Sequence, residues 1–131
     1  MAKEAHVTSE EGFVASIDIR EYDMTLDSGA EVGPDTLESL VGTYAACYVP
    51  ALRVGAEQRN VGDLGRIEID VVGELNDDDK LDAVSFDVTV NAEVDAEDVT
   101  AVVERANALC KVHDALKPSL HADVSINGHA G

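Results

Sequence analysis

Two cysteines carry the thiol chemistry of this 131-residue chain, and they lie far apart in the sequence, at Cys47 and Cys110. Cys47 lies in the apolar stretch TLESLVGTYAACYVPALRVG, residues 36–55. A thiol in such a stretch is either an inert core residue or a nucleophile. The residues that flank Cys47 do not decide between these two interpretations.

Charge is distributed unevenly around the two cysteines. The chain has 27 acidic residues against 9 basic ones, a formal net charge of −18. The segment around Cys47, residues 36–59, is neutral, and the segment around Cys110, residues 105–118, is net basic. Nearby cations lower the pKa of a thiol and carboxylates raise it, so both segments suit a thiolate. Buried helices also contain few acids because burying charge is costly, and this second interpretation stays open.

The second cysteine begins the sequence Cys-Lys-Val-His, residues 110–113. On a continuous helix, residues three apart share a face, so the Cys110 thiol and the His113 imidazole could meet. Such a pair could activate the thiol or supply two metal ligands. A zinc site needs about four ligands, so Cys47 and His121 would have to converge with the pair. The spacing matches no standard zinc motif, and we expect His113 to be a polar or hydrogen-bonded helix residue.

The acidic composition indicates where the protein works and which partners it avoids. Self-repulsion at this charge destabilises a compact chain, but at about 1 M salt the Debye length is roughly 3 Å and most repulsion is screened. We therefore expect a halophilic cytoplasm. Nucleic acid and anionic membranes are disfavoured partners, because little in the chain would neutralise phosphates. The sequence contains no apolar run of membrane-spanning length and no visible signal peptide, so we expect a cytoplasmic protein without a static disulfide.

Apolar periodicity predicts the elements that position these residues. Alternation predicts strands over residues 13–20, 22–26, 66–72, 84–94 and 122–126, after a short strand near residues 4–8, and helical spacing predicts helices over 37–55 and 99–110. Asp35 and Glu38 predict a capping box at the start of the first helix, and Pro50 should kink it. The alternation changes phase between Arg20 and Glu21, which predicts a turn or bulge there.

The order of these elements favours an α+β class with a largely antiparallel sheet, in one domain spanning residues 1–131. The chain has no Trp, 3 Tyr and 2 Phe, so its core must come mainly from small aliphatic side chains. Small side chains bury little apolar area each, which makes a dimer with a shared core plausible.

Two segments together resemble the OsmC/Ohr family. GPDTLESLVGTYAACYVPAL looks like the first cysteine helix of that family, and CKVHDALKPSLHADVSI looks like its second cysteine segment. The resemblance covers nearly the whole chain. It implies an OsmC-like α+β fold, in which an antiparallel sheet wraps two central cysteine-bearing helices of an intertwined homodimer. Active sites would then form at the subunit interface.

The resemblance also implies an activity, that of a thiol peroxidase in oxidative-stress defence. Such enzymes reduce organic hydroperoxides, and hydrogen peroxide less well, with no metal or organic cofactor. Matched by position, Cys47 corresponds to the peroxidatic cysteine and Cys110 to the resolving one. Glu38 corresponds to the supporting acid, and Arg20, with Arg53 as an alternative, to the activating arginine. A dithiol reductant, lipoylated in relatives, would restore the thiols.

Three positions depart from the best-characterised peroxidase branches. Leu37 stands where those branches have the Glu, Thr36 where they have a Pro, and Lys111 where a Pro follows the second Cys. The chain therefore resembles the OsmC-like branch more closely. An apolar stripe that includes Leu40 and Tyr44 would favour bulky hydroperoxides. The alternatives are a non-catalytic OsmC-like dimeric module that binds a small apolar ligand or partner and, less favoured, a Cys/His metal site.

Overall fold

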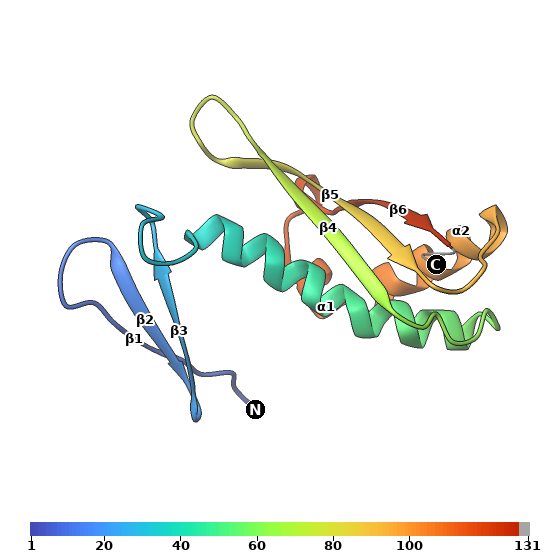
Figure 1. Ribbon diagram of the computed structural model, residues 1–131, viewed down its shortest axis with the longest axis horizontal. Coiled ribbons are helices and arrows are strands. Elements are labelled where there is room, and N and C mark those ends of the chain that lie inside the picture. The colour runs from blue at the N-terminus through green and yellow to red at the C-terminus, as the bar shows by residue number, and fades with distance from the viewer. Residues whose placement is uncertain (129–131) are drawn as a thin grey trace. The chain divides into compact units, whose positions relative to one another are not determined.

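The structure is a computed structural model that describes residues 1–128 of the chain, and Figure 1 shows the order of its elements. In chain order these are β1 His6–Thr8, β2 Val14–Ile19, β3 Tyr22–Asp27, α1 Thr36–Gln58, β4 Ile67–Leu75, β5 Leu81–Val90, α2 Ala96–Leu109, α3 Lys111–Ala115, the 3-10 helix η1 Pro118–Leu120 and β6 Asp123–Asn127. The chain forms two compact units, Met1–Leu40 and the part that begins at Val41.

The N-terminal unit is built on a three-stranded antiparallel sheet in the order β1-β2-β3. The predicted turn is confirmed, because Ile19 pairs with Tyr22 and only Arg20 and Glu21 connect the two strands. Arg20 adopts the left-handed conformation, with φ 55°, as a two-residue hairpin turn requires. The Arg20 guanidinium lies over the Tyr22 ring, 5.3 Å from its centroid.

The loop between β3 and α1 is organised by the buried carboxylate of Asp27. The carboxylate accepts hydrogen bonds from the backbone N–H groups of Gly29 at 2.8 Å, Glu31 at 3.1 Å and Val32 at 3.2 Å. The backbone N–H of Asp27 donates to the carbonyl of Pro34 at 2.9 Å. These bonds close the loop on itself just before the first helix begins. The N–H groups of Gly29, Val32 and Glu31 hold the pKa of Asp27 below its usual range, although burial opposes them.

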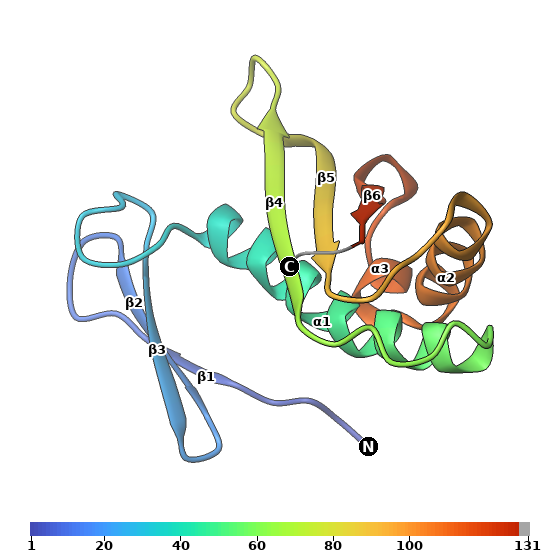
Figure 2. The same ribbon diagram turned by 45° about the vertical axis from the view of Figure 1, so that its right-hand side comes forward.

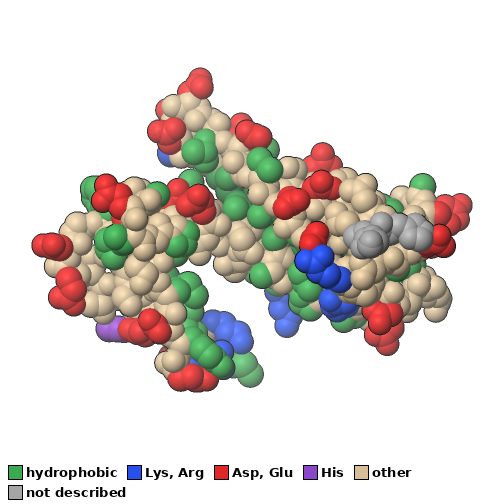
Figure 3. Space-filling model, in the orientation of Figure 1, with side chains coloured by type: hydrophobic (Ala, Val, Ile, Leu, Met, Phe, Trp, Pro, Cys, Tyr) green, Lys and Arg blue, Asp and Glu red, His purple; other side chains and the backbone are tan. Residues whose placement is uncertain are grey.

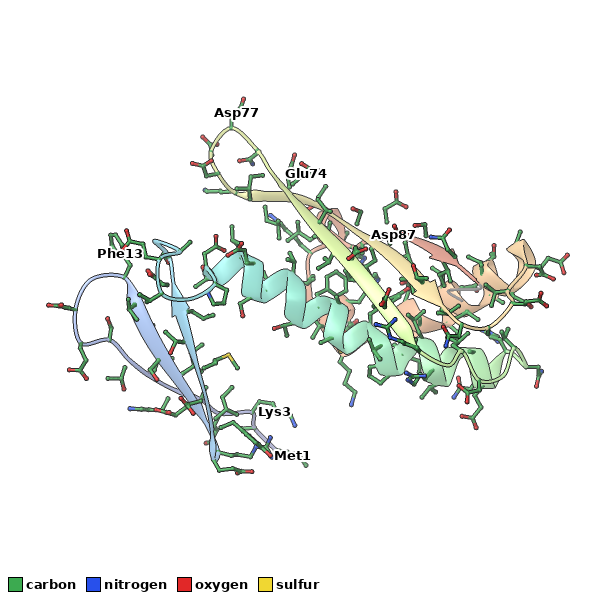
Figure 4. All side chains as sticks on the ribbon, in the orientation of Figure 1. Met1, Lys3, Phe13, Glu74, Asp77 and Asp87 are labelled. Carbon is green, nitrogen blue, oxygen red and sulfur yellow. The ribbon has the colours of Figure 1, made fainter. Side chains whose placement is uncertain are left out.

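We expect Asp27→Asn to lower the melting temperature at pH 7, measured by circular dichroism in molar KCl. The pKa of Asp27 is lower in the folded state than in the unfolded state, so the carboxylate stabilises the fold above about pH 4 and loses this contribution as the pH falls through the folded pKa. The difference between wild type and variant should therefore shrink at low pH. Asp77→Asn, at the tip of the β4–β5 hairpin (Figure 4), makes the same charge change at an exposed site and should leave the melting temperature nearly unchanged.

The second unit contains a three-stranded sheet in the order β4-β5-β6. β4 and β5 pair antiparallel as a long hairpin, but β6 pairs parallel with β5, with Phe86 opposite Val124. The predicted largely antiparallel pairing is therefore confirmed, and the pairing of β6 with β5 is the one parallel exception among the described strands. The physical reason is the connection, because α2 and α3 form a crossover that returns the chain to the same end of the sheet.

Helices cover one face of this sheet. Alternate residues of β5, namely Val84, Phe86, Val88 and Val90, are buried, whereas the residues between them are mostly exposed. Figures 1 and 2 show α1, α2 and α3 on the same side of the three strands. The rings of Tyr44 and Tyr48 meet Phe86 edge-on, with centroid distances of 4.7 Å and 5.1 Å. This aromatic centre compensates for the small aliphatic side chains around it.

α1 and α2 approach each other closely at Gly55. A Cβ atom built at Gly55 would lie 3.3 Å from the carbonyl oxygen of Val102 and 3.4 Å from the backbone nitrogen of Ala106. Any larger side chain would push α2, which ends directly before Cys110, away from α1. The glycine therefore helps to set the distance between the two cysteine segments.

The local predictions for the first helix are largely confirmed. The backbone N–H of Glu38 donates to Asp35 Oδ1 at 2.7 Å, and Glu38 Oε1 accepts from the backbone N–H of Asp35 at 2.9 Å, which is a capping box. The helix runs through Pro50 to Gln58. The second predicted helix is wrong at its end, because Cys110 has extended backbone angles, φ −73° and ψ 112°, and separates α2 from α3.

The surface carries the charge that the composition implies. On the face drawn in Figure 3, acidic side chains are spread over both units, whereas Lys and Arg gather in a few places. This distribution fits the net charge of −18. Within residues 1–128, no helix is both long enough and apolar enough to cross a bilayer.

Candidate active site

Cys47 lies on α1, half-exposed, at the edge of the hydrophobic core. It opens onto a depression of about 330 Å³, which is lined by Cys47, Pro50, Ala51, Val54, Leu109 and Lys111. These residues come from α1, from the last residue of α2 and from the first residue of α3. The lining is apolar apart from the thiol and one ammonium group, so an apolar molecule can reach the sulfur.

Cys110 lies between α2 and α3 and is 1% exposed. Its thiol hydrogen-bonds to the sulfur of Cys47, so the structure brings together two cysteines that are far apart in the sequence. The extended backbone at Cys110 makes this arrangement possible, because a new helix begins at Lys111. The first backbone N–H groups of α3, those of Lys111 and Val112, hydrogen-bond to the Cys47 sulfur.

The two thiols have opposite electrostatic surroundings. Burial raises the pKa of Cys47, but the Val112 N–H, the Cys110 thiol, and the N–H and charge of Lys111 outweigh it and lower that pKa. Burial raises the pKa of Cys110, and the hydrogen bond to Cys47 and the charge of Cys47 raise it further. Cys47 is therefore the thiol that ionises first, with Cys110 as its protonated hydrogen-bond donor.

A buried network joins α1, α3 and the chain before β6. The Tyr44 hydroxyl lies 2.6 Å from Nδ1 of His113 and accepts the backbone N–H of Ala122 at 3.0 Å. The His113 ring stacks on His121, with centroids 3.8 Å apart, and Nε2 of His121 donates to the carbonyl of Leu116 at 3.1 Å. The network fixes α3, whose N-terminus contacts Cys47, against α1.

The proton positions in this network follow from its chemistry. Burial and the neighbouring His121 lower the pKa of His113, so its ring is neutral near pH 7. The Tyr44 hydroxyl already accepts from Ala122, and its own proton is therefore donated to Nδ1 of His113. The expectation of a hydrogen-bonded His113 is confirmed, with Tyr44 rather than Cys110 as the side-chain partner of Nδ1.

Comparisons with known proteins decide the family. A sequence profile described as "OsmC-like protein" matches residues 28–125. The chain belongs to the OsmC-like family. An uncharacterised protein of Haloferax volcanii is 39% identical over 122 residues, which cover 93% of this chain and 92% of that one.

Solved structures confirm the OsmC-like α+β fold. An OsmC-like protein from Mycoplasma pneumoniae matches with a TM-score of 0.80 and 14% identity, over 98% of this chain and 96% of that one. The organic hydroperoxide resistance protein OhrB of Bacillus subtilis matches with a TM-score of 0.66 and 21% identity, over 95% and 98%.

Three other residues that the OsmC/Ohr resemblance suggested are not among those that line the depression around Cys47, and each has a contact of its own. Arg20 and Glu38 belong to the N-terminal unit, where Arg20 contacts Tyr22 and Glu38 caps α1. Arg53, the alternative arginine, donates from Nη1 to the carbonyl of Gly65 at 2.7 Å. The roles of Arg20 and Glu38 in the site stay predictions.

A Cys/His metal site gains no support from the part of the chain that the structure describes. Within residues 1–128, no group of three or more His, Cys, Asp or Glu side chains could hold a metal ion. The rings of His113 and His121 stack on each other, and their bonded nitrogens are engaged with Tyr44 and Leu116.

The apolar stripe expected to receive the substrate is wrong at Tyr44. This side chain is 1% exposed and its hydroxyl lies in the buried network, and it is not among the residues that line the depression around Cys47. The residues beside Cys47 are instead Pro50, Val54 and Lys111, among others. A signal for Lys111 was present in the sequence, since a lysine directly follows the second cysteine in a chain that has few bases.

Proposed function

We propose that this OsmC-like protein is a thiol-dependent peroxidase that reduces organic hydroperoxides, and hydrogen peroxide less well, in oxidative-stress defence. The observation that carries the proposal is the asymmetry of the two hydrogen-bonded thiols. The accessible one, Cys47, has the lowered pKa that an attacking thiolate needs. The buried one, Cys110, is adjacent and can form a disulfide with it.

In the first step, the Cys47 thiolate attacks the distal oxygen of the hydroperoxide. An S–O bond forms, the O–O bond breaks, and the alkoxide leaves and takes up a proton to become the alcohol. Cys47 is then a sulfenic acid. In this proposal, the Arg20 guanidinium stabilises the thiolate and the negative charge on the departing oxygen, and Glu38 orients that guanidinium.

In the second step, the Cys110 sulfur loses its proton and attacks the Cys47 sulfur. A disulfide forms and hydroxide leaves, which becomes water. Oxidation of Cys47 itself prepares this step, because the thiolate charge that raises the pKa of Cys110 is then gone. In this proposal, a dithiol reductant, that of a lipoylated protein, supplies two electrons and two protons and restores both thiols. Such a cycle suits a cytoplasm that keeps thiols reduced.

The depression beside Cys47 supports a preference for organic substrates. Its walls at Pro50, Ala51, Val54 and Leu109 can bury the carbon skeleton of a hydroperoxide, which gains about 25 cal/mol per Å² of apolar area. Hydrogen peroxide has no such group to bury, so it gains nothing from these walls.

An intertwined homodimer is part of the proposal, and the sheet of the N-terminal unit supports it. Ile17 pairs with Met24 and Ile19 with Tyr22, so these apolar side chains gather on one face. Tyr22 is 58% exposed and Met24 45%. A contiguous apolar face of this kind marks an interaction surface, and a second copy of the chain would cover it.

One equivalent of cumene hydroperoxide should convert both free thiols into a Cys47–Cys110 disulfide. The experiment is performed in molar KCl, followed by alkylation of the remaining thiols and peptide mapping by mass spectrometry. Dithiothreitol or dihydrolipoamide should then restore both thiols. If Cys47 and Cys110 are still alkylated in full after peroxide treatment, the proposed peroxidase is wrong.

The apolar depression also supports a second candidate, a non-catalytic OsmC-like module that binds a small apolar ligand. This candidate predicts saturable binding of cumyl alcohol, which has the same carbon skeleton but no peroxide bond, together with two thiols that resist oxidation. A disulfide in the peroxide experiment would exclude it.

A further inference from the structure

Lys111 is the charged residue among the six that line the depression around Cys47. It is exposed, it follows Cys110 directly, and it is the first residue of α3. The chain has a net charge of −18, so a cation at this position runs against the composition. Its place beside the reacting sulfur calls for a functional explanation.

The break at Cys110 gives Lys111 two routes to Cys47. Its backbone N–H hydrogen-bonds to the sulfur, as does the N–H of Val112, and its ammonium group interacts with the charge of the thiolate. A continuous helix over residues 99–113 would have left both N–H groups bonded to carbonyls within that helix. The nearest acid on α3, Asp114, lies one turn later and acts on His113.

We propose that the Lys111 ammonium group stabilises the Cys47 thiolate and attracts negatively charged reagents to it. This inference rests on the proposed function only in taking Cys47 as the reacting thiol. Lys111 belongs to the same unit as both cysteines, so its charge would act on Cys47 in addition to any contribution from Arg20. The Lys111 backbone N–H keeps its hydrogen bond whatever the side chain is.

Alkylation of Cys47 tests the proposal without any peroxide. The thiolate displaces iodide from the reagent, so an S–C bond forms while the C–I bond breaks and iodide leaves with its electron pair. Iodoacetamide is neutral, so its rate depends on the fraction of Cys47 that is ionised and on how easily the reagent reaches the sulfur. Iodoacetate is an anion, so its rate depends in addition on the electrostatic potential around Cys47. The rate at Cys47 is measured for each reagent by peptide mapping, at pH 7 and the lowest KCl concentration that preserves the circular dichroism spectrum.

Lys111→Gln should slow the alkylation of Cys47 by iodoacetamide about threefold and by iodoacetate about tenfold, because the side-chain charge is lost while the backbone N–H remains. The ratio of the two rates should therefore fall about threefold, and the wild-type ratio should also fall as KCl is raised. Lys111→Arg should keep both rates near those of the wild type. A simple shift of α3 would change both rates together and leave their ratio unchanged.

Lys117→Gln is the matched control, because it changes the net charge equally at an exposed lysine outside the lining of the depression. It should leave the rate ratio unchanged. The proposal is overturned if Lys111→Gln keeps the wild-type ratio, or if Lys117→Gln lowers the ratio equally. The expected ratios together with no peroxide-induced disulfide would support the role of Lys111 and refute the peroxidase alone.

Discussion

Cys47→Ser should reduce peroxide consumption by roughly three orders of magnitude or more, to the background rate of the reductant. A serine hydroxyl stays protonated near neutral pH, so the lowered pKa that the Cys47 site produces would no longer yield a nucleophile. The measurement follows cumene hydroperoxide with dithiothreitol or dihydrolipoamide in molar KCl. Molar KCl is used because self-repulsion destabilises so acidic a chain at low salt, and circular dichroism in the same buffer must show that the variant is folded.

Cys110→Ser is the matched variant, since it also replaces one sulfur by oxygen but at the other end of the thiol pair. It should consume the first equivalent of peroxide and then stall at the sulfenic acid, which dimedone would trap on Cys47. Later turnovers should be about tenfold slower or worse, because the external dithiol must replace the adjacent thiol. Peroxide consumption by Cys47→Ser at the wild-type rate would refute the mechanism.

The fold elements that the sequence predicted well are those that a local pattern determines. In β5 every second residue from Val84 to Val90 faces the core, so alternation alone located the strand. The capping box at Asp35 and Glu38 needs only residues three apart. The turn at Arg20 follows from the change of phase between two alternating strands.

The arrangement that makes the candidate site depends instead on distant contacts. Helical spacing continued through Cys110, and nothing local predicted that the backbone would become extended there and start α3 at Lys111. The contact between Cys47 and Cys110 joins residues 63 positions apart in the numbering, and only the family resemblance suggested it. The parallel pairing of β6 likewise depends on a crossover that spans two helices.

Tyr44 illustrates the same limit within a single residue. Its spacing correctly predicted that it lies on the apolar side of α1, but the partners of its hydroxyl come from α3 and from Ala122, 78 residues later. A polar atom on an otherwise apolar face has no periodic signal. The sequence therefore assigned Tyr44 to a substrate-binding stripe, whereas the structure makes it the centre of a buried hydrogen-bond network.

Tyr44→Phe should destabilise the protein by about 2–4 kcal/mol, because the ring remains but Nδ1 of His113 and the N–H of Ala122 lose a buried partner. Tyr48→Phe is the matched control one turn along α1, where the hydroxyl makes one hydrogen bond, to Asn107 at 2.7 Å. That variant should lose about 1 kcal/mol. Both are measured by urea unfolding in molar KCl.

Tyr44→Phe should also raise the pKa of Cys47 and slow its alkylation, whereas Tyr48→Phe should change neither. The network holds α3 against α1, and the first N–H groups of α3 lower the pKa of Cys47. A loosened α3 would let that pKa rise, so iodoacetamide should alkylate Cys47 more slowly at pH 7 in the Tyr44 variant, in conditions where it is still folded. Equal losses of stability in the two variants, with unchanged alkylation in both, would show that the network does not position the thiolate.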